Sequence, residues 1–544
     1  MPASAFTVVL AQINVTVGDI RGNLARILNA ARDAEAAHGA DLILFPELAL
    51  TGYPPQDLLF QPGFRADLDG GLSGLLAGCK GAPIVVGYPH YEGSRIYNAA
   101  AVIHQGGIKT LAFKQCLPNY GVFDEKRYFT PGEHTSVWSH RGVPMGILIC
   151  EDLWDAAPSR RAREGGAQML LGLSASPFSL GKIGEREAVF AERVRDVELP
   201  LAYANLVGGQ DELVFDGTSL ALGRSGEVFG RAPSFEEGLW PIRFNLDHGI
   251  VTLEPGAVTE HMAGVETVYR AITLALGDYV RKNHFPGVLL GLSGGIDSAL
   301  TLALAVDALG AGRVKGVLMP SPYTSDLSRE EALRQARTLG VETLEIPIDP
   351  LLRTIGEAIE PALGSGREGV VFENIQARTR GMLLMALSNA SGRLVLSTGN
   401  KSEMAMGYAT LYGDMAGGFA PLRDVSKTLV YALARYRNTR APVIPDPVIE
   451  REPTAELRSG QRDRDSLPPY DVLDSILEAL VEQNRSVADL VQSGFDAKMV
   501  QSVARQVLVM EYKRRQAPIG VKVSRRAFGI ERRYPVTSGF KEEG

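Results

Sequence analysis

The segment at residues 290–298, LGLSGGIDS, has the composition of a phosphate-binding turn. From Ser293 onward it contains two glycines, two serines and one carboxylate, namely Gly294, Gly295, Ser293, Ser298 and Asp297. Glycines let a backbone approach a ligand closely because they carry no Cβ. The free N–H groups at the start of a following helix favour an anion, and a carboxylate in the turn suits magnesium bound to phosphate. We therefore predict a pyrophosphate loop, although the Gly-Lys-Ser/Thr of a Walker motif is missing.

Two later clusters of polar residues could serve the same chemistry. The segment ENIQARTR places Arg378 and Arg380 where they could meet phosphate or carboxylate, or form a solvated helix face. The segment STGNKSE, residues 397–403, follows a strand pattern, which is where open α/β sheets usually bind ligands. Glu403 in this segment is either a second magnesium carboxylate or part of a helix cap.

The first half of the chain carries three separate groups that could work together on an amide. Glu47 follows the apolar run DLILFP, Lys114 stands in AFKQC, and Cys150 ends PMGILIC. A cysteine thiolate is a nucleophile, a carboxylate can take its proton, and a lysine can stabilise an oxyanion. Each residue alone has a simpler explanation as a buried thiol, a capping carboxylate or a solvated lysine.

These residues need strands and helices to position them, and the hydrophobic pattern predicts an alternation of both. Strands are expected at 6–13, 41–46, 83–88, 98–104, 144–150, 167–173 and 199–207, with a helix at 23–38. A second series contains helices at 264–283, 328–339 and 373–390 and strands at 287–292, 314–319, 343–346 and 393–397. This alternation predicts an α/β fold class.

The chain is long enough for more than one domain. We place a linker at residues 246–262, because LDHGIVTLEPGAVTEHM shows no clear periodicity, with domains at 1–245 and 263–544 on either side. Residues 451–469, REPTAELRSGQRDRDSLPP, are charged and punctuated by proline. We expect them to form a mobile loop over a site.

The composition is that of an ordinary soluble globular protein. Of 544 residues, 45% are hydrophobic and 22% are charged, and the net charge of −7 argues against a nucleic-acid surface. No apolar run reaches transmembrane length, and the start lacks the basic region of a signal peptide. Three cysteines without metal-ligand spacing fit a reducing cytoplasm.

Six segments between residues 290 and 518 together resemble the NAD synthetase family of ATP pyrophosphatases: LGLSGGIDSA, ENIQARTR, STGNKSE, YGD, REPTAEL and EYKRRQAP. The resemblance implies a Rossmann-like, doubly wound parallel sheet. It implies ATP contacts by Gly291, Leu292, Ser293, Gly294, Gly295, Ile296, Asp297, Ser298, Thr398, Lys427 and Thr454. It also implies contacts to deamido-NAD by Asn374, Arg378, Glu403 and Lys513, and Mg²⁺ at Asp297 and Glu403. Leu411 and Gly418 stand where short synthetases often show lysine and aspartate, which leaves those two contacts open.

The first 245 residues resemble the nitrilase family of carbon–nitrogen hydrolases, through FPELALTGYPPQDL, the segment around Lys114, and ICEDLW. That resemblance implies an αββα sandwich and a triad in which Glu47 is the base, Lys114 stabilises the oxyanion and Cys150 is the nucleophile. Nitrilase-like domains fused to NAD synthetases act on glutamine. The closer resemblance to them implies glutamine contacts by Tyr120, Ser176 and Lys182.

Together the two resemblances imply a ligase, because an adenylating synthetase that makes an amide needs ammonia and a glutaminase supplies it. The expected reaction adenylates deamido-NAD with ATP and amidates it with ammonia from glutamine, giving NAD⁺, AMP, pyrophosphate and glutamate. Three alternatives stay open: a hydrolase of another amide with a regulatory nucleotide site, an amidotransferase with another acceptor, and a nucleotide-binding protein without turnover.

The expected partners are the small-molecule substrates deamido-NAD, ATP and glutamine, with no nucleic acid and no membrane. The resemblance to fused synthetases further implies a cytoplasmic homo-oligomer. The path of ammonia and the strength of coupling between the two active sites do not follow from the sequence.

Overall fold

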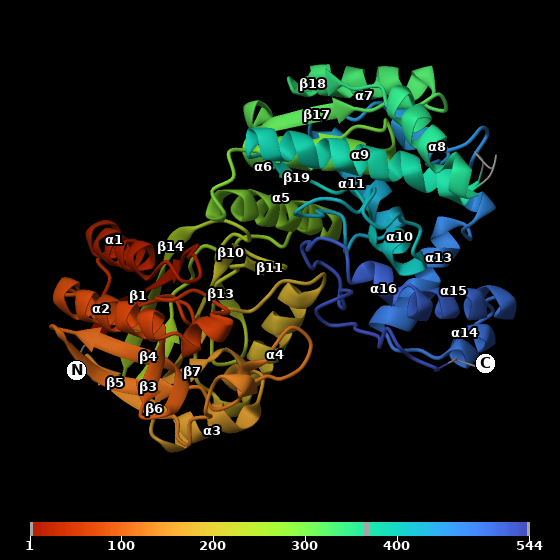
Figure 1. Cartoon of the computed structure of the whole chain (residues 1–544). Coiled ribbons are helices and arrows are strands. Elements are labelled where there is room, and N and C mark those ends of the chain that lie inside the picture. Colours follow the sequence, from red (N-terminus) through yellow and green to blue (C-terminus); the bar gives the residue numbers. More distant parts are fainter. Residues whose placement is uncertain (1–3, 364–368, 541–544) are drawn as a thin grey trace. The chain divides into compact units, whose positions relative to one another are not determined.

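The structure is a computed structural model that describes residues 4–363 and 369–540. The chain divides into two compact units, Met1–Met262 and Ala263–Gly544. Each unit has its own sheets, helices and core (Figure 1). Both units are of the mixed α/β type that the alternating pattern predicted.

The first unit contains two sheets packed face to face. The seven-stranded sheet has the order β15-β14-β1-β2-β3-β4-β5, and the six-stranded sheet has the order β13-β12-β9-β8-β7-β6. Side chains of both sheets, among them Leu10, Leu44, Ile147 and Leu171, share one buried core, as in other stacked sheets. The strands are β1 (Ser4–Gln12), β2 (Leu42–Leu44), β3 (Ile84–Glu92), β4 (Arg95–His104), β5 (Gly107–Phe113), β6 (Ser136–His140), β7 (Val143–Ile149), β8 (Met169–Ser174), β9 (Leu201–Asn205), β12 (Leu220–Leu222), β13 (Val228–Arg231), β14 (Gly238–Asp247) and β15 (Ile250–Leu253), beside the hairpin β10 (Val207–Gln210) and β11 (Leu213–Asp216).

Helices cover the outer faces of these two sheets. α1 (Ile20–His38) and α2 (Pro62–Gly78) pack against each other and against β1 and β4 of the larger sheet. α3 (Ala156–Glu164) and α4 (Lys182–Val197) do the same on the smaller sheet, where Phe190 packs with Leu148 and Leu201. The four layers form the αββα sandwich that the resemblance implied (Figure 1).

The segment that we expected to be a linker, residues 246–262, is built into the first unit. Strand β15 pairs antiparallel with β14, and Thr259 N donates to the carbonyl of Arg231. Val251 and Leu253 are buried while their neighbours are exposed, which is the alternation of an edge strand. The surrounding glycine, proline and histidine residues concealed this short pattern, so the expectation of an irregular linker is corrected.

The second unit is built on a four-stranded parallel sheet in the order β18-β17-β16-β19. Its strands are β16 (Val288–Gly291), β17 (Val314–Leu318), β18 (Glu342–Glu345) and β19 (Leu394–Val395). The chain leaves β16 for β17 on one side and returns later to β19 on the other. The carboxyl end of β16 is therefore a topological switch point, where open α/β sheets bind ligands.

Helices lie on both faces of this sheet, which makes it doubly wound as the resemblance implied. On one face α8 (Asp349–Leu363) and α9 (Val370–Ser391) pack through Leu352 and Leu384 onto Leu289 of β16. α5 (Gly264–Lys282), α6 (Ile296–Leu309), α7 (Asp326–Leu339) and α11 (Lys427–Arg440) form contacts with one another, and α6 also contacts β16 and β17. α12 (Asp446–Glu450) follows α11 and packs on α6.

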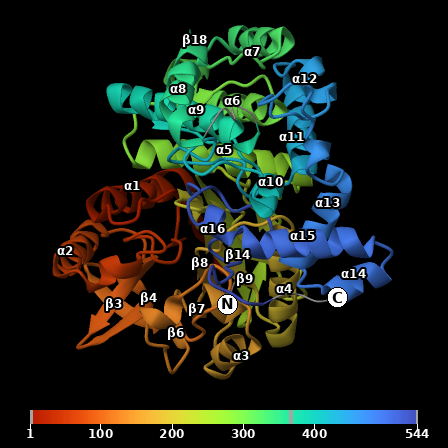
Figure 2. The same cartoon turned by 45° about the vertical axis from the view of Figure 1, so that its right-hand side comes forward.

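A cluster of short helices, for which the sequence motifs gave no expectation, completes the second unit. It consists of α13 (Tyr470–Leu477), α14 (Val487–Gln492), α15 (Ala497–Val509) and α16 (Glu511–Arg514). Their core includes Leu473, Ile476 and Val503, and also Ala405 of α10 (Lys401–Met406). Figures 1 and 2 show α10 beside this cluster in both views. Within the described residues no helix has the length and apolar character needed to cross a membrane.

Candidate active sites

In the first unit the three separate reactive groups meet at the ends of strands. Glu47 follows β2, Lys114 directly follows β5, and Cys150 directly follows β7. Glu47 and Lys114 are no more than 1% exposed, and Cys150 is 3% exposed. The sandwich therefore encloses a thiol, a carboxylate and an ammonium group in a place that water reaches poorly.

The ammonium group of Lys114 lies between two carboxylates. Its Nζ donates to Glu47 Oε1 and to Glu125 Oε1, both at 2.7 Å. Asn98 Nδ2 also donates to Glu47 Oε1 at 2.7 Å, and the amide of Ala175 donates to Glu47 Oε2 at 2.9 Å. Glu47 is thus held by three donors from separate elements, which fixes its orientation.

Glu125 is a member of this site that the sequence did not reveal. It lies in a 3₁₀ turn, Glu125–Arg127, within the charged stretch FDEKR, and it also accepts from the hydroxyl of Tyr53 at 2.8 Å. Burial raises the pKa of Glu125 to about 7, against the opposing effect of Lys114. Only its complete burial, unusual for a glutamate in such a stretch, marks it out.

The pKa values of both Lys114 and Cys150 lie well above their usual values, for different physical reasons. Burial lowers the pKa of Lys114, but Glu125 and Glu47 outweigh that effect and hold the pKa well above its usual value. Burial and the negative charge of Glu47 raise the pKa of Cys150, while Lys114 opposes them. The resting site therefore contains a charged lysine and a neutral thiol, so the thiol must give up its proton when it attacks.

The backbone at Cys150 is set by a local turn and a buried carboxylate. Cys150 has a φ of 48°, an uncommon conformation for a residue other than glycine, at the start of the 3₁₀ turn Cys150–Leu153. Asp152 accepts from the amides of Gln115, Cys116 and Ile149 at 2.8–3.0 Å. It thereby ties the segment that follows Lys114 to the segment that carries Cys150.

Of the three residues that the resemblance connects with glutamine, Tyr120 and Lys182 contact the segment after Cys150, and Ser176 follows Ala175, whose amide donates to Glu47. Tyr120 is 59% exposed, and its hydroxyl donates to Glu151, the residue after Cys150. Ser176 is buried two residues beyond the end of β8, and its amide donates to Asn205. The ammonium group of Lys182 lies 3.8 Å from the ring centre of Trp154.

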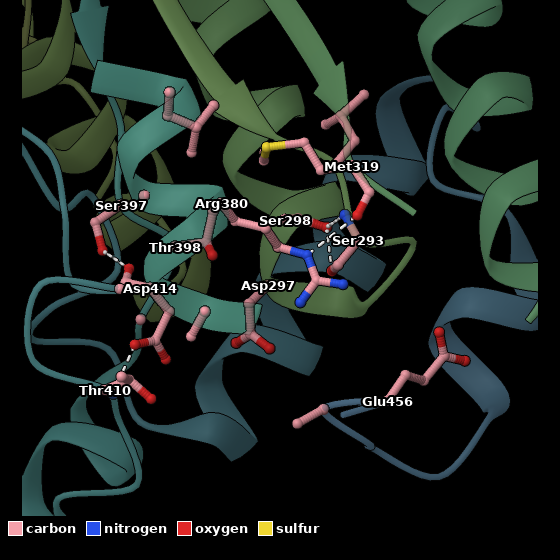
Figure 3. A pocket seen from close by; sticks show the side chains of 18 of the residues that line it. Ser293, Asp297, Ser298, Met319, Arg380, Ser397, Thr398, Thr410, Asp414 and Glu456 are labelled. Carbon is pink, nitrogen blue, oxygen red and sulfur yellow. Dashed lines mark hydrogen bonds between the residues drawn. The ribbon is translucent and has the colours of Figure 1, made fainter. Parts of the chain in front are cut away.

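In the second unit a cavity of about 270 Å³ opens at the switch point of the sheet. It is lined by the turn after β16, by the segment after β19 and by α9 (Figure 3). Gly294 has a φ of 76°, and a Cβ there would lie 2.2 Å from the carbonyl oxygen of Ser328, so only glycine fits. Of the expected ATP residues, Gly291, Leu292, Ser293, Asp297, Ser298, Thr398 and Thr454 line this cavity.

The two carboxylates expected to hold magnesium lie together in this unit. Asp297 Oδ2 and Glu403 Oε1 lie 2.5 and 3.4 Å from Nζ of Lys427, whose side chain is 2% exposed. Asn400 orients both carboxylates, since its Nδ2 donates to Asp297 Oδ1 at 2.9 Å and its backbone amide donates to Glu403 Oε2 at 3.3 Å. Burial raises the pKa of Glu403 to about 8, an effect that Lys427 opposes.

This donor set fits magnesium bound to a nucleotide. Among the described residues no group of three or more histidine, cysteine or acidic residues forms a metal cage. Magnesium at phosphate sites is usually held by one or two carboxylates together with phosphate oxygens. Asp297 and Glu403 supply that number of carboxylates, and both line the cavity beside the phosphate-binding turn.

Arg380 supplies a positive charge inside the cavity. Figure 3 shows its side chain reaching toward Ser293 and Ser298, and its Nε donates to the carbonyl of Met319 at 3.1 Å. Burial lowers the pKa of Arg380 to about 10, which leaves it charged at neutral pH. An anion is therefore favoured there. The sequence offered Arg378 and Arg380 equally, but only Arg380 lines the cavity.

The segment at 451–469 closes one side of the cavity. Arg451 donates to the carbonyl of Gly294 and to Ser328 Oγ, both at 2.7 Å. Glu456 accepts from Ser325 Oγ and Ser328 Oγ at the start of α7. These contacts join the segment directly to the phosphate-binding turn.

The other expected dinucleotide residues gather around residues 407–411, of which Thr410 lines the cavity. Asn374 accepts from Thr410, Arg378 donates to the carbonyl of Leu411, and Lys513 donates to the carbonyls of Gly407 and Ala409.

Gly418 cannot take the role that an aspartate has in short synthetases. Its amide donates to the carbonyl of Val395 in β19. A Cβ at this position would lie 2.3 Å from Cδ1 of Leu394, so a side chain there would require the side chain of Leu394 to move.

Comparisons with known proteins agree with this geometry. The carbon-nitrogen hydrolase family model matches residues 7–248, and the NAD synthase family model matches residues 268–517. The chain is 47% identical to the glutamine-dependent NAD(+) synthetase of Xanthomonas campestris, over 99% of this chain and 98% of that protein. It is 45% identical to the enzyme of the same name from Acinetobacter baylyi, over 99% of both. The chain belongs to the glutamine-dependent NAD⁺ synthetase family.

Solved structures of this family support the same conclusion. The glutamine-dependent NAD⁺ synthetase of Acinetobacter baumannii, determined with ADP bound, matches 99% of the chain with a TM-score of 0.80 and 42% sequence identity. The enzyme from Cytophaga hutchinsonii shares the fold, with a TM-score of 0.83 at 22% identity. The resemblance of both halves to their families, inferred from short motifs, is therefore confirmed over nearly the whole chain.

Proposed function

We propose that the chain makes NAD⁺ from deamido-NAD, ATP and glutamine, with each half of the reaction in its own unit. The observation that carries this proposal is that one chain of this family holds a buried cysteine–carboxylate–lysine site and a phosphate-binding cavity. The first unit releases ammonia from glutamine. The second activates the nicotinate carboxylate as an adenylate, and ammonia then displaces AMP to form the amide.

In the first unit Glu47 takes the proton of the Cys150 thiol as the sulfur attacks the amide carbon of glutamine. Lys114 has three N–H donors and spends two of them on Glu47 and Glu125, so one remains for the oxyanion. Collapse of the tetrahedral intermediate expels ammonia, which receives the proton from Glu47, and leaves a thioester. Water activated by Glu47 then releases glutamate.

Around this triad the substrate is held by neighbouring side chains. We assign the amino-acid end of glutamine to Tyr120, Ser176 and Lys182, because Tyr120 and Lys182 contact the segment after Cys150 and Ser176 follows Ala175, whose amide donates to Glu47. Lys182 offers a positive charge for the α-carboxylate.

In the second unit the backbone of 291–298 and Arg380 bind the phosphates of ATP, with further contacts from Thr398, Lys427 and Thr454. Asp297 and Glu403 would hold Mg²⁺, which when bound offsets the phosphate charge and makes pyrophosphate a better leaving group. Asn374, Arg378 and Lys513 bind deamido-NAD beside residues 407–411, and Glu403 faces the same substrate.

We assign the glutaminase to residues 1–245 and the synthetase to residues 263–544, with the connecting segment packed onto the glutaminase sheet. We further propose that the enzyme works in the cytoplasm as a homo-oligomer. Product analysis tests the reaction as a whole: deamido-NAD, ATP, magnesium and glutamine should give NAD⁺, AMP, pyrophosphate and glutamate. Omission of any one should stop NAD⁺ formation. If glutamate forms but AMP and pyrophosphate never do, the chain hydrolyses an amide and is no synthetase.

Replacing Glu125 with glutamine should slow glutamine-dependent synthesis about 10- to 100-fold, because Lys114 loses a charged hydrogen-bond partner and its alignment to the oxyanion. Steady-state rates with glutamine and with ammonium chloride check this expectation, and the ammonium-supported rate should not change. Asp124→Asn is the matched control, since Asp124 is the exposed neighbour. A Glu125→Gln enzyme with full glutamine-dependent activity would remove Glu125 from the site.

The segment at 451–469 should become resistant to trypsin when ATP and deamido-NAD are bound. It holds three half-exposed arginines, Arg458, Arg462 and Arg464, while Thr454 lines the cavity. Bound ligand should order the segment and slow its cleavage at least about tenfold. Cleavage after Lys80, in an exposed turn of the first unit, serves as the internal control. Equal cleavage of 451–469 with and without ligands would count against a lid.

A further inference from the structure

Lys427 is held at both ends by one helix of the C-terminal cluster. Tyr470 and Asp474 are four residues apart on α13, so they lie on the same face of the helix. The ring centre of Tyr470 lies 5.3 Å from Nζ of Lys427. Asp474 lies at the other end of the residue, where it binds the backbone at the start of α11.

The carboxylate of Asp474 joins the starts of α10 and α11. Its Oδ1 accepts from Ser402 Oγ at 2.5 Å, and its Oδ2 accepts from the amide of Thr428 at 2.8 Å. Ser402 Oγ in turn accepts from the amide of Lys427 at 2.9 Å. A negative charge is favourable here because Lys427 and Thr428 provide the first free amides of α11.

All parts of this connection are buried. Ser402 is 0% exposed, Lys427 is 2% exposed and Asp474 is 8% exposed. Ser402 directly precedes Glu403, so the bond that fixes the backbone of Lys427 also fixes the backbone beside Glu403. The distance of 3.4 Å between Lys427 Nζ and Glu403 Oε1 therefore depends on Asp474, which contacts neither of these two atoms.

The hydroxyl of Tyr470 extends the same arrangement. It donates to Asp463 at 2.9 Å, and Asp463 lies in the segment at 451–469 that closes the cavity. α13 thus contacts Lys427, the start of α10 and the closing segment at once.

We propose that Asp474 is a positioning residue for adenylation, which sets the spacing of Glu403 and Lys427 through Ser402 and the start of α11. Tyr470 completes the platform under the ammonium group. The proposal rests on the proposed roles of Lys427 and Glu403 toward ATP and deamido-NAD. It gives the C-terminal helices a part in the chemistry, although they line no part of the described cavity.

The test is Asp474→Asn in the full chain, assayed for ammonium-supported NAD⁺ synthesis at varied ATP. Asparagine keeps the shape, but it removes the negative charge at the start of α11 and replaces one of the two acceptor oxygens with an NH₂ group, which cannot accept a hydrogen bond. We expect KM for ATP to rise about tenfold or more and kcat to fall, while glutamine hydrolysis in the first unit stays unchanged. Asp471→Asn is the matched control, because Asp471 lies one turn earlier on α13 with an exposed side chain, and it should behave as wild type.

Ser402→Ala keeps the proposal testable if Asp474→Asn does not fold. It removes the hydrogen bond between Ser402 and Asp474 but leaves the one between Thr428 and Asp474. It should therefore raise KM for ATP by a smaller factor than Asp474→Asn does. A lower kcat at an unchanged KM for ATP would mean that Asp474 only keeps the protein folded, and it would overturn the proposal. Wild-type values of KM for ATP and of kcat in either Asp474→Asn or Ser402→Ala would also overturn the proposal.

Lys427→Met separates this proposal from the proposed function. If Lys427→Met makes NAD⁺ at the wild-type rate, the role of Lys427 itself is wrong. If Lys427→Met is inactive while Asp474→Asn and Ser402→Ala both show wild-type kinetics, only the positioning role fails.

Discussion

Replacing Cys150 with alanine should abolish glutamine-dependent NAD⁺ synthesis and leave ammonium-supported synthesis close to the wild-type rate. Loss of the nucleophile of a catalytic triad typically costs on the order of 10⁴-fold or more in rate. Only amide cleavage needs that nucleophile, because free ammonia can attack the adenylate directly. The deciding quantity is the ratio of ammonium-supported to glutamine-supported rates, measured in the variant and in the wild type.

Packing should change little in this variant, because cysteine and alanine are both small and often buried. Cys116→Ala is the matched control: burial raises the pKa of Cys116 to about 12, so its thiol is unreactive, and both rates should stay normal. Glu47→Ala and Lys114→Ala should show the same split as Cys150→Ala, since the three groups act as a unit. Retained glutamine-dependent activity in Cys150→Ala would refute the triad. Loss of both activities in a folded variant would show that the two sites cannot work separately.

Replacing Asp297 with alanine should lower the rate of NAD⁺ formation about 10²-fold or more, whether glutamine or ammonium supplies the nitrogen. Asp297 lies in the phosphate-binding turn, where its carboxylate is one of the two placed to hold magnesium. Hydrolysis of glutamine at Cys150 should continue at least in part, because that site lies in the other unit. The measurement pairs NAD⁺ formation with glutamate release in the same reaction.

The same variant leaves Lys427 with Glu403 as its one direct carboxylate partner among the described residues, so some loss of stability is expected. A thermal melt of the variant must therefore accompany the assay, and Glu403→Gln offers a second way to remove one carboxylate. Glu357→Ala, which removes an exposed carboxylate from α8, should leave both activities unchanged. Normal NAD⁺ synthesis by Asp297→Ala at ordinary magnesium concentration would contradict the proposed role of Asp297 in binding magnesium.

The segment at residues 246–262 contains a strand that the local sequence does not predict. Glycine, proline and histidine around IVTL indicated an irregular connection, yet Val251 and Leu253 bury their side chains as β15 joins the edge of β14. A four-residue strand carries too little local signal to be recognised, because it is stabilised by the neighbouring strand more than by its own composition. The C-terminal helices were missed for a related reason: they are short and depend on a shared core.

Glu125 and Lys427 show the same limit within the sites. Nothing local distinguishes Glu125 from the other charges of FDEKR, and its role follows from the 2.7 Å contact with Lys114 and from burial. Lys427 was expected to contact ATP. Its position between Asp297 and Glu403 depends on how α6, α10 and α11 pack together, and α6 and α11 begin more than a hundred residues apart in the chain.

The residue types and their neighbours along the chain indicate which groups could do chemistry and on which kind of element each lies. The phosphate-binding turn follows from local rules of glycine turns and helix starts, whereas the expected roles of Cys150, Glu47 and the two magnesium carboxylates rest on the resemblance of whole motifs to known families. Which of these groups meet follows from the three-dimensional fold, because contact between distant residues depends on sheet order, helix packing and burial. It brought Glu125 to Lys114, chose Arg380 over Arg378 for the cavity, and placed Asp474 behind Lys427.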